Sequence, residues 1–314
     1  MSEQSINRHP LVSVIIPNYN HARFLEQRLD SVFNQTYQNF EVIVLDDCSV
    51  DNSLEVINRY TDNPHLSQIV VNEINSGSVF NQWDKGIHLA NGDIIWIAES
   101  DDYCELNMLE ELVKVYTSQP NMVIAFSTTR YVDKDNVVHS FSKYNLSRRV
   151  FSSKAFITRC LITGNVIINA SSAIFSKEAA LNVRPNYKSF RGSGDYLFWT
   201  EIAAQGSVAM VDLKLNYWRR AGNSVTDGNF SSANAAVEDF AIIEYIESLY
   251  PLSWLHRRLV FAQYSYLFRN VAFDSEDAKR KCYEIWQIEK HSSLFDRCLL
   301  WVRSKFIICF GIYI

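Results

Sequence analysis

The sequence is poor in glycine, and the two common glycine-rich phosphate-binding loops are missing from it. Only 10 of the 314 residues are Gly. Neither a G-x-G-x-x-G pattern after a strand nor a G-x-x-x-x-G-K-[ST] pattern occurs, which excludes the two usual backbone cradles for phosphate groups. If the protein binds a nucleotide, other groups must meet the charge of its phosphates.

Other functional classes are excluded by features that the sequence lacks. The 30 Lys and Arg residues are outnumbered by 35 Asp and Glu residues, so the basic surface that a nucleic-acid partner requires is missing. The 6 Cys residues form no C-x-x-C pair, which favours free thiols in a reducing compartment. Residues 1–10 lack the apolar stretch of a signal peptide, and no run of 18 apolar residues occurs. We therefore expect a cytoplasmic protein without a membrane-spanning helix.

Short apolar runs alternate with amphipathic segments as far as residue 126. The runs predict buried strands at residues 12–16, 40–45, 68–71, 94–97 and 122–126. The segments between them predict helices at residues 24–35, 54–60, 79–90 and 106–116. Pro17 is expected to end the first strand, because proline cannot donate to a central ladder. The alternation indicates an α/β fold with a mainly parallel sheet, in which ligands bind beyond the carboxyl ends of the strands.

Beyond residue 126 the regular alternation stops. We expect short strands at residues 128–132, 137–141 and 208–213, helices at 153–162 and 195–204, and a mainly helical region from residue 233 onward. The chain is therefore expected to contain one α/β domain over residues 1–228, divided near residue 126, and a C-terminal helical region over residues 229–314. The seam is expected near residues 226–232.

Two groups of carboxylates follow predicted strands: Asp46 and Asp47 after the second, and Glu99, Asp101 and Asp102 after the fourth. Both groups belong at the same edge of the sheet, and no Lys or Arg stands beside either in the sequence. Crowded carboxylates repel each other and favour a cation between them. Oxygen ligands select a hard ion, Mg²⁺ or Mn²⁺, which would also neutralise a diphosphate. The alternative is that these residues form turns or helix caps, which is the favoured interpretation for Asp51 and Asp102.

Longer segments occur in an order that is typical of one enzyme family. They read VSVIIPNYN at 12–20, SVFNQTY at 31–37, FEVIVLDDCSVDNS at 40–53, ANGD at 90–93 and IWIAESDD at 95–102. On these segments, the chain resembles the family 2 glycosyltransferases of the GT-A fold, inverting enzymes that use nucleotide-sugar donors. The resemblance covers about residues 11–226. It implies a Rossmann-like, mixed but mainly parallel sheet flanked by helices, with the nucleotide-binding half in residues 1–126 and the acceptor half in residues 127–228.

The resemblance also implies roles for individual residues. The expected donor-binding residues are Pro17, Tyr19, Asn20, Asp46, Asp47, Ser78, Lys85, Glu99, Ser100 and Arg220. Asp101 matches the metal-binding carboxylate of the family's D-x-D motif, and Glu99 replaces the first Asp of that motif and is the second expected ligand of Mg²⁺ or Mn²⁺. The family's closing segment carries a His, and Arg220 is the nearest residue to its position. Arg suits a diphosphate but cannot bind a metal, and the alternative for Arg220 is a solvated surface side chain.

Asp195 is the expected catalytic base. It follows Gly192-Ser193-Gly194 and precedes an apolar helix, and the resemblance places the family's general base at this position. One carboxylate suffices for an inverting transfer, because the diphosphate leaves as an anion and needs no acid. The alternative is that Asp195 only caps the helix.

The expected acceptor-binding residues are Asn169, Trp199 and Trp218. The resemblance places the segment around Asn169 beneath the acceptor, and Trp rings stack on sugar faces, although a Trp more often belongs to the core. Residues 299–314 combine apolar and cationic side chains, which favours peripheral contact with the inner face of the cytoplasmic membrane. Internal packing or homodimer formation explains the same pattern.

These observations predict a metal-dependent inverting glycosyltransferase. Its partners would be a nucleotide-sugar donor and a saccharide or lipid-linked acceptor, and the resemblance suggests synthesis of O-antigen, lipopolysaccharide or capsule. One alternative is a nucleotidyltransferase, but the basic, glycine-rich loop expected near its N-terminus is absent. A degenerate glycan-binding module is the other alternative, because Glu99 and the missing His depart from the family pattern.

Overall fold

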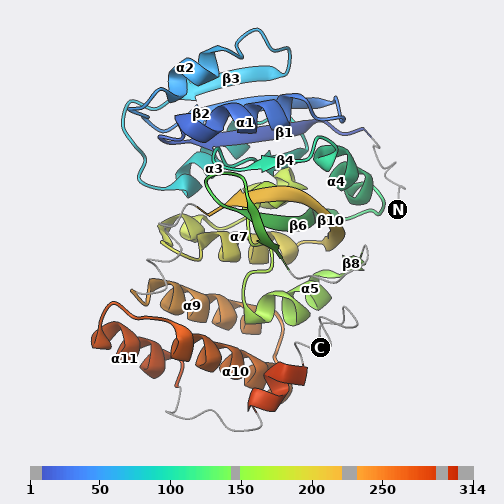
Figure 1. Ribbon diagram of the computed structural model, residues 1–314. Helices are drawn as coiled ribbons and strands as arrows, with labels where there is room; N and C mark the ends of the chain where they lie inside the picture. Colours follow the sequence, from blue (N-terminus) through green and yellow to red (C-terminus); the bar gives the residue numbers. More distant parts are fainter. Residues whose placement is uncertain (1–8, 143–148, 221–231, 288–295, 303–314) are drawn as a thin grey trace.

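The computed structural model describes residues 9–142, 149–220, 232–287 and 296–302 (Figure 1). Within these residues, ten strands form one mixed sheet. Their spatial order is β3 (Leu66–Val71), β2 (Phe40–Asp46), β1 (Val12–Asn18), β4 (Ile94–Ile97), β9 (Ala173–Ser176), β6 (Met122–Val132), β10 (Ser207–Arg219) and β5 (Tyr103–Cys104), with β7 (Val138–Phe141) beside β6 and β8 (Arg149–Phe151) beside β10.

The first half of the sheet is parallel and buried on both faces. β1 pairs in parallel with both β2 and β4, and β2 pairs in parallel with β3. Alternate side chains of β1 enter two different cores, Ile15 on one face and Val14 and Ile16 on the other. The first face is covered by α3 (Val79–Leu89), α5 (Ser153–Arg159) and α7 (Gly194–Ala203), and the second by α1 (Ala22–Phe33), α2 (Ser53–Asn58) and α4 (Met108–Tyr116). The predicted α/β fold with a mainly parallel sheet is confirmed.

Pro17 does not end the first strand, so that prediction is wrong. It lies within β1, opposite Leu45 of β2. On the other side, β4 pairs with β1 only as far as Ile15, whose carbonyl accepts the amide of Ala98 at 2.8 Å. Because the ladder on that side has already ended, it needs no amide donor from residue 17.

The second half of the sheet departs from simple alternation. β9 runs antiparallel between β4 and β6, while β10 runs parallel to β6. β6 and β10 are both longer than the strands predicted there, because β6 continues through the segment predicted as a separate strand and β10 extends to Arg219. Both extensions bring residues toward the edge of the sheet where the acidic segments lie.

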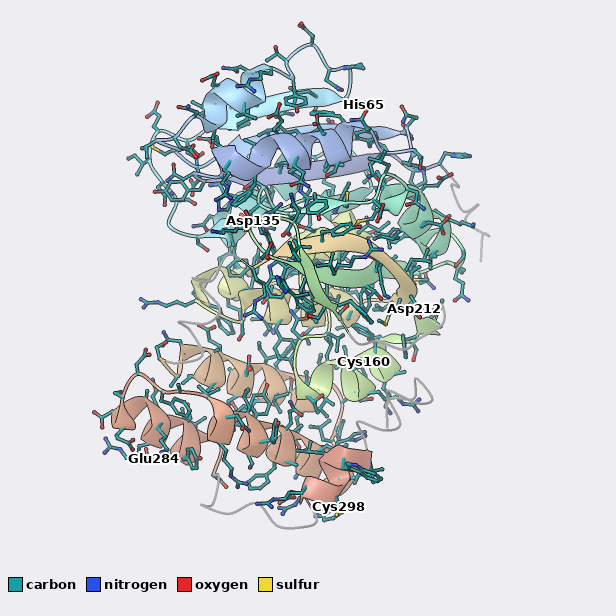
Figure 2. The ribbon with its side chains drawn as sticks, in the orientation of Figure 1. His65, Asp135, Cys160, Asp212, Glu284 and Cys298 are labelled. Carbon is teal, nitrogen blue, oxygen red and sulfur yellow. The ribbon has the colours of Figure 1, made fainter. Side chains whose placement is uncertain are left out.

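The C-terminal helices form a further layer. In Figure 1, α9 (Asn234–Leu249) lies beneath α7, and α10 (Trp254–Asn270) and α11 (Glu276–Ile285) lie beneath α9. One hydrophobic core runs from the sheet into this layer, and buried Cys160 lies at the boundary (Figure 2). The rings of Tyr264 and Trp286 stack there with centroids 3.7 Å apart. The α/β layers and the C-terminal helices therefore share apolar packing.

Two expectations fall largely outside the described residues. The expected seam near residues 226–232 overlaps residues 221–231, and most of the expected membrane-contact segment, residues 299–314, lies at 303–314. In the part of the chain that the structure describes, no helix is both long and apolar enough to cross a membrane. The five cysteines found there are all free, as the absence of C-x-x-C motifs predicted.

We predict that Gly92→Ala destabilises the protein. A Cβ at this position would lie 2.5 Å from the Leu11 carbonyl oxygen and 2.9 Å from the Ser13 amide nitrogen. Both are backbone atoms beside the start of β1 and cannot rotate away, so we expect a loss of about 1–3 kcal/mol of unfolding free energy, as for an overpacked core. Asp93→Ala, at the neighbouring exposed residue, should change it by less than about 0.5 kcal/mol. Denaturant unfolding measures both, and equal losses would contradict the steric argument.

Candidate active site

The largest cavity among those that contain predicted site residues has a volume of about 790 Å³. We call it the main cleft. Its lining includes Ser78, Trp83, Glu99, Asn169, Asp195 and Trp218. Both halves of the α/β fold therefore contribute to one site. Another cavity, of about 520 Å³, is lined by Asp93 and Tyr116 at the opposite edge of the sheet and contains none of the predicted site residues.

The acidic segment from Glu99 to Asp102 is held between two buried arginines. Arg28 of α1 donates from Nε to the Glu99 carbonyl at 2.8 Å, and its guanidinium lies 3.9 Å from the Asp102 carboxylate. Arg219 of β10 donates its backbone amide to Asp102 Oδ1 at 3.0 Å and its Nε to the Asp101 carbonyl at 2.9 Å. No Lys or Arg is near this segment in the sequence, but the fold brings two beside it. The segment therefore has cationic neighbours in space that its sequence neighbours do not reveal.

The arginines do not remove the electrostatic cost of burying these carboxylates. Burial and the charge of Asp101 together raise the pKa of Glu99 to about 8. Burial and the Asp101 charge also raise the pKa of Asp102 to about 6. The pKa of Asp101 is itself raised by burial, although Arg28 and Arg219 oppose this. A raised pKa means that each of these carboxyl groups binds a proton more readily than usual, and a cation bound beside them would favour their ionised forms.

The carboxylates of this segment are candidate ligands for a divalent ion. Among the described residues, no three His, Cys, Asp or Glu side chains are grouped as a ready-made metal cage. Glu99 lines the cleft, and the charge of Asp101 acts on it directly, so two carboxylates are close together. Protein sites commonly bind Mg²⁺ through one or two carboxylates plus phosphate oxygens and water. The pair fits that kind of site and does not fit an all-protein cage.

Helix α3 links the two acidic segments through consecutive side chains. Gln82 Nε2 donates to Asp47 Oδ1 at 2.9 Å, and Trp83 Nε1 donates to Glu99 Oε1 at 2.8 Å. Asp47 also accepts from Ser76, through its amide at 2.9 Å and its hydroxyl at 2.8 Å, and from Asn72 Nδ2 at 2.6 Å. Asp47 thus fixes the loop that leads into α3.

Three of the residues predicted to bind the nucleotide-sugar donor are buried. Pro17 lies buried in β1, Asp46 is fully buried and accepts from Asn18 Nδ2 at 2.7 Å, and the hydroxyl of buried Ser100 lies 2.8 Å from His21 Nδ1. These three residues are buried in this structure, and their direct contact with a donor stays a prediction. They hold the backbone at the carboxyl ends of β1, β2 and β4.

Four other residues predicted to bind the nucleotide-sugar donor lie at or beside exposed surface. Tyr19 is 47% exposed at the end of β1. Asn20 has a left-handed backbone (φ 57) and accepts from the Val50 amide at 2.8 Å. Ser78 caps α3 and lines the main cleft. Lys85 donates to Asn72 Oδ1 at 2.6 Å and so joins the Asp47 network.

Asp195 lies at the first turn of α7 and faces two cavities. It lines the main cleft and also a second space of about 340 Å³. Asn165 Nδ2 donates to its Oδ2 at 2.8 Å, and burial raises the pKa of Asp195 to about 6. A carboxylate with this pKa is mostly ionised at neutral pH and binds a proton more readily than an ordinary Asp, which suits a general base.

The loop before Asp195 is held by the C-terminal helices. The Glu238 carboxylate of α9 accepts the backbone amides of Arg191, Gly192 and Ser193 at 2.7–2.9 Å. Next to it, Asp239 accepts the Ser193 hydroxyl at 2.6 Å. Neither acid was identified from the sequence, because a Glu-Asp pair in an amphipathic helix looks like ordinary surface charge.

Two of the three predicted acceptor-binding residues line the main cleft, and the third is buried in the core. Trp199 is fully buried among Trp83, Phe175 and Phe198, so the expectation that it stacks on a sugar is wrong. Asn169 lines the main cleft and donates to Asp102 Oδ2 at 2.8 Å. Trp218 lines both the main cleft and the second cavity.

Cationic side chains line the main cleft at positions that the sequence analysis did not single out. Lys188 and Arg191 belong to its lining, from the segment before α7. Lys188 also pairs with Asp84 at 2.9 Å. Arg220, the predicted replacement for the family His, is exposed, with its guanidinium 5.4 Å from the Trp218 ring. The neighbouring Arg219 binds the acidic segment instead, and nothing in the sequence distinguishes the two.

Comparison with known proteins gives a consistent result. Residues 13–182 match the family described as glycosyl transferase family 2. An uncharacterized glycosyltransferase of Haemophilus influenzae is 28% identical over 227 residues, which covers 71% of this chain and 85% of that protein. The hyaluronan synthase of Pasteurella multocida is 35% identical over 136 residues, or 43% of this chain. The match spans 14% of the length of that synthase and of the chondroitin synthase of the same species.

Solved structures share the fold. TarS residues 1–349 of S. aureus, in complex with UDP-GlcNAc, aligns with a TM-score of 0.65 at 18% identity and covers 87% of this chain and 79% of its own. The mannosyltransferase PcManGT of Pyrobaculum calidifontis, in complex with GDP-Man and Mn²⁺, aligns with a TM-score of 0.56 at 18% identity, covering 96% and 82%. These likenesses concern the fold alone, and they confirm the expected GT-A architecture.

We predict that Glu238→Ala loosens the loop that carries Asp195. Three backbone amides would lose their acceptor, so we expect a loss of about 1–2 kcal/mol of unfolding free energy, as when a helix loses its N-cap. Hydrogen exchange at the amides of residues 191–193 should accelerate. Glu244→Ala, at an exposed position of the same helix, is the matched control and should leave both measurements nearly unchanged. Unaltered exchange in Glu238→Ala would contradict the role given to this carboxylate.

Proposed function

The chain belongs to glycosyl transferase family 2, and on that premise we propose that it is an inverting glycosyltransferase. It moves a sugar from a nucleotide-diphospho-sugar donor to a saccharide or lipid-linked acceptor. The observation that carries this proposal is the main cleft, where Glu99 from the first half and Asp195 from the second half line one space. One carboxylate serves the donor and the other serves the attacking hydroxyl.

The donor end of the cleft is suited to a diphosphate in two ways. Lys188 and Arg191 line the cleft and supply positive charge, and an Arg guanidinium matches phosphate oxygens. Glu99 and Asp101 would hold a divalent ion, Mg²⁺ or Mn²⁺, which when bound neutralises the diphosphate charge. The binding of Mn²⁺ and GDP-Man by PcManGT, and of UDP-GlcNAc by TarS, supports this arrangement. The two proteins bind different nucleotides, so the proposal for this chain names only the nucleotide-diphospho-sugar class.

Asp195 performs the proton transfer in this proposal. Its carboxylate takes the proton of the acceptor hydroxyl while the hydroxyl oxygen forms a bond to the anomeric carbon. The bond between that carbon and the diphosphate oxygen breaks, and its electron pair leaves with the nucleoside diphosphate. No carboxylic acid is required for the leaving group, and Asp195 is the one carboxylate that the second half of the α/β fold contributes to the described lining of the main cleft.

We further propose that the product is a bacterial surface polysaccharide. Hyaluronan synthase of Pasteurella multocida and a putative teichuronic acid glycosyltransferase of Bacillus subtilis are relatives whose names point to such polymers. Action in the cytoplasm, and membrane contact through residues 299–314, stay predictions. Hydrolysis of UDP-, GDP- and dTDP-sugars with Mg²⁺ or Mn²⁺ tests the proposal, because a glycan-binding module would hydrolyse none of them.

Asp101→Ala is expected to reduce donor hydrolysis to background, because the metal loses one of its two protein ligands. The measurement is release of nucleoside diphosphate at several Mn²⁺ concentrations. Asp93→Ala is the matched control, since this exposed Asp precedes β4 at the opposite edge of the sheet. Normal turnover in Asp101→Ala would refute its role as a metal ligand.

Asp195→Asn is expected to lower the rate of transfer by about 10²–10⁴-fold, the usual contribution of a general base, while donor affinity is retained. In the wild-type protein, the base works only when ionised, so transfer should rise with pH up to about 6, the raised pKa of Asp195, and then level off. Rates across pH 4.5–8 measure this limb, and isothermal titration measures donor affinity. Normal transfer by Asp195→Asn would exclude it as the base.

A further inference from the structure

The second cavity at Asp195 lies between the α/β layers and the C-terminal helices. We call this space of about 340 Å³ the seam pocket. Asn165, Asp195 and Trp218 line it from the α/β side, and Asp239, Gln263 and Tyr264 from α9 and α10. Asp195 and Trp218 also line the main cleft, so the two spaces meet at the carboxylate of Asp195.

We propose that the seam pocket binds the terminal sugar of the acceptor, and that α9 and α10 thereby determine acceptor specificity. This inference rests on the proposed function. An inverting transfer requires the hydroxyl to attack from the side opposite the leaving diphosphate. Glu99, Lys188 and Arg191 line the main cleft and not the seam pocket. The seam pocket is therefore the space beside Asp195 that is separate from the residues assigned to the diphosphate.

The lining of the seam pocket has the chemistry of a carbohydrate site. Trp218 and Tyr264 supply aromatic surface, which packs against the apolar faces of sugar rings. Asn165 and Gln263 supply amides, which pair with hydroxyl groups. A few polar groups placed among aromatic side chains are typical of small-ligand pockets. The volume is of the size that a single sugar unit with ordered water would occupy.

The charges of the pocket select against an anionic acceptor. Asp195 and Asp239 are the charged residues in its described lining, which contains no Lys, Arg or His. A uronic acid placed there would bring a third carboxylate into a partly buried space, and like charges at an interface exclude the wrong partner. The main cleft, by contrast, has Lys188 and Arg191. The terminal acceptor sugar is therefore uncharged.

Gln263 is the side chain of α10 that is best placed to recognise this sugar. Asp239 accepts hydrogen bonds from the hydroxyls of Ser193 and Tyr264, the latter at 3.1 Å. It therefore helps to hold the loop before Asp195. Gln263 is only partly buried, and its amide makes no hydrogen bond to another described residue. An amide directed at a ligand can be replaced by an apolar side chain without disturbing the protein's own hydrogen bonds.

The test uses the full chain, the nucleotide-sugar that it hydrolyses, and p-nitrophenyl glycosides as probes. The neutral probes carry glucose, galactose, mannose, rhamnose or N-acetylglucosamine, and the glucuronide and galacturonide are charged counterparts. Gln263→Leu should raise the KM of the accepted neutral probe about three- to tenfold, the worth of one neutral hydrogen bond, with a smaller effect on the donor KM. Gln263→Lys should shift the preference toward the uronides. Tyr266→Leu, at an exposed position of α10, should change neither KM.

The outcomes separate this inference from the function on which it rests. If no nucleotide-sugar is hydrolysed with either metal ion, the proposed function fails, and the inference fails with it. If the donor is hydrolysed, three results overturn the inference alone: no neutral probe is glycosylated, a uronide is preferred, or Gln263→Leu retains the wild-type acceptor KM. A raised acceptor KM in Gln263→Leu with an unchanged Tyr266→Leu supports it.

Discussion

The site depends on how the fold holds three carboxylates at the end of β4. Glu99, Asp101 and Asp102 are placed where burial opposes their ionisation and their charges oppose one another. Arg28 and Arg219 hold this segment by its carbonyls and by Asp102, so the backbone stays in place without full neutralisation of the charge. In the proposed function, a rigid segment whose carboxylates oppose one another is suited to a cation that arrives with the substrate.

The acids around the cleft divide into those that hold backbone and those that face the ligand. Asp47 fixes the loop before α3, and Glu238 fixes the loop before α7. Glu99 and Asp195 instead line the cleft. The glycine shortage is consistent with this design, because side-chain carboxylates order these loops and carboxylates with a cation take the place of a glycine-rich cradle. Few backbone positions need the freedom of glycine.

The sequence was sufficient to predict those strands and helices that a local pattern of apolar residues determines. Apolar periodicity placed β1, β2, β4 and the helices between them, because the strands are buried almost throughout and each helix buries one face. It was insufficient where distant segments meet. The arginines that bind the acidic segment come from α1 and β10, and the carboxylate that holds the loop before Asp195 comes from α9. Trp199 shows the same limit. In the sequence, an aromatic residue that is buried in the core cannot be told from one that lines the cleft, because the packing of the helix decides between them.

The C-terminal helices belong to the site as much as to the support of the fold. They share a core with α7, and through Glu238 and Asp239 they bond to the loop that presents Asp195. Loop amides that lack such acceptors would have to be satisfied by water, and the loop would lose its fixed geometry. A general base must lie within hydrogen-bond distance of the hydroxyl that it deprotonates. In the proposed function, the position of Asp195 therefore depends on α9, which holds the preceding loop through Glu238 and lines the seam pocket through Asp239.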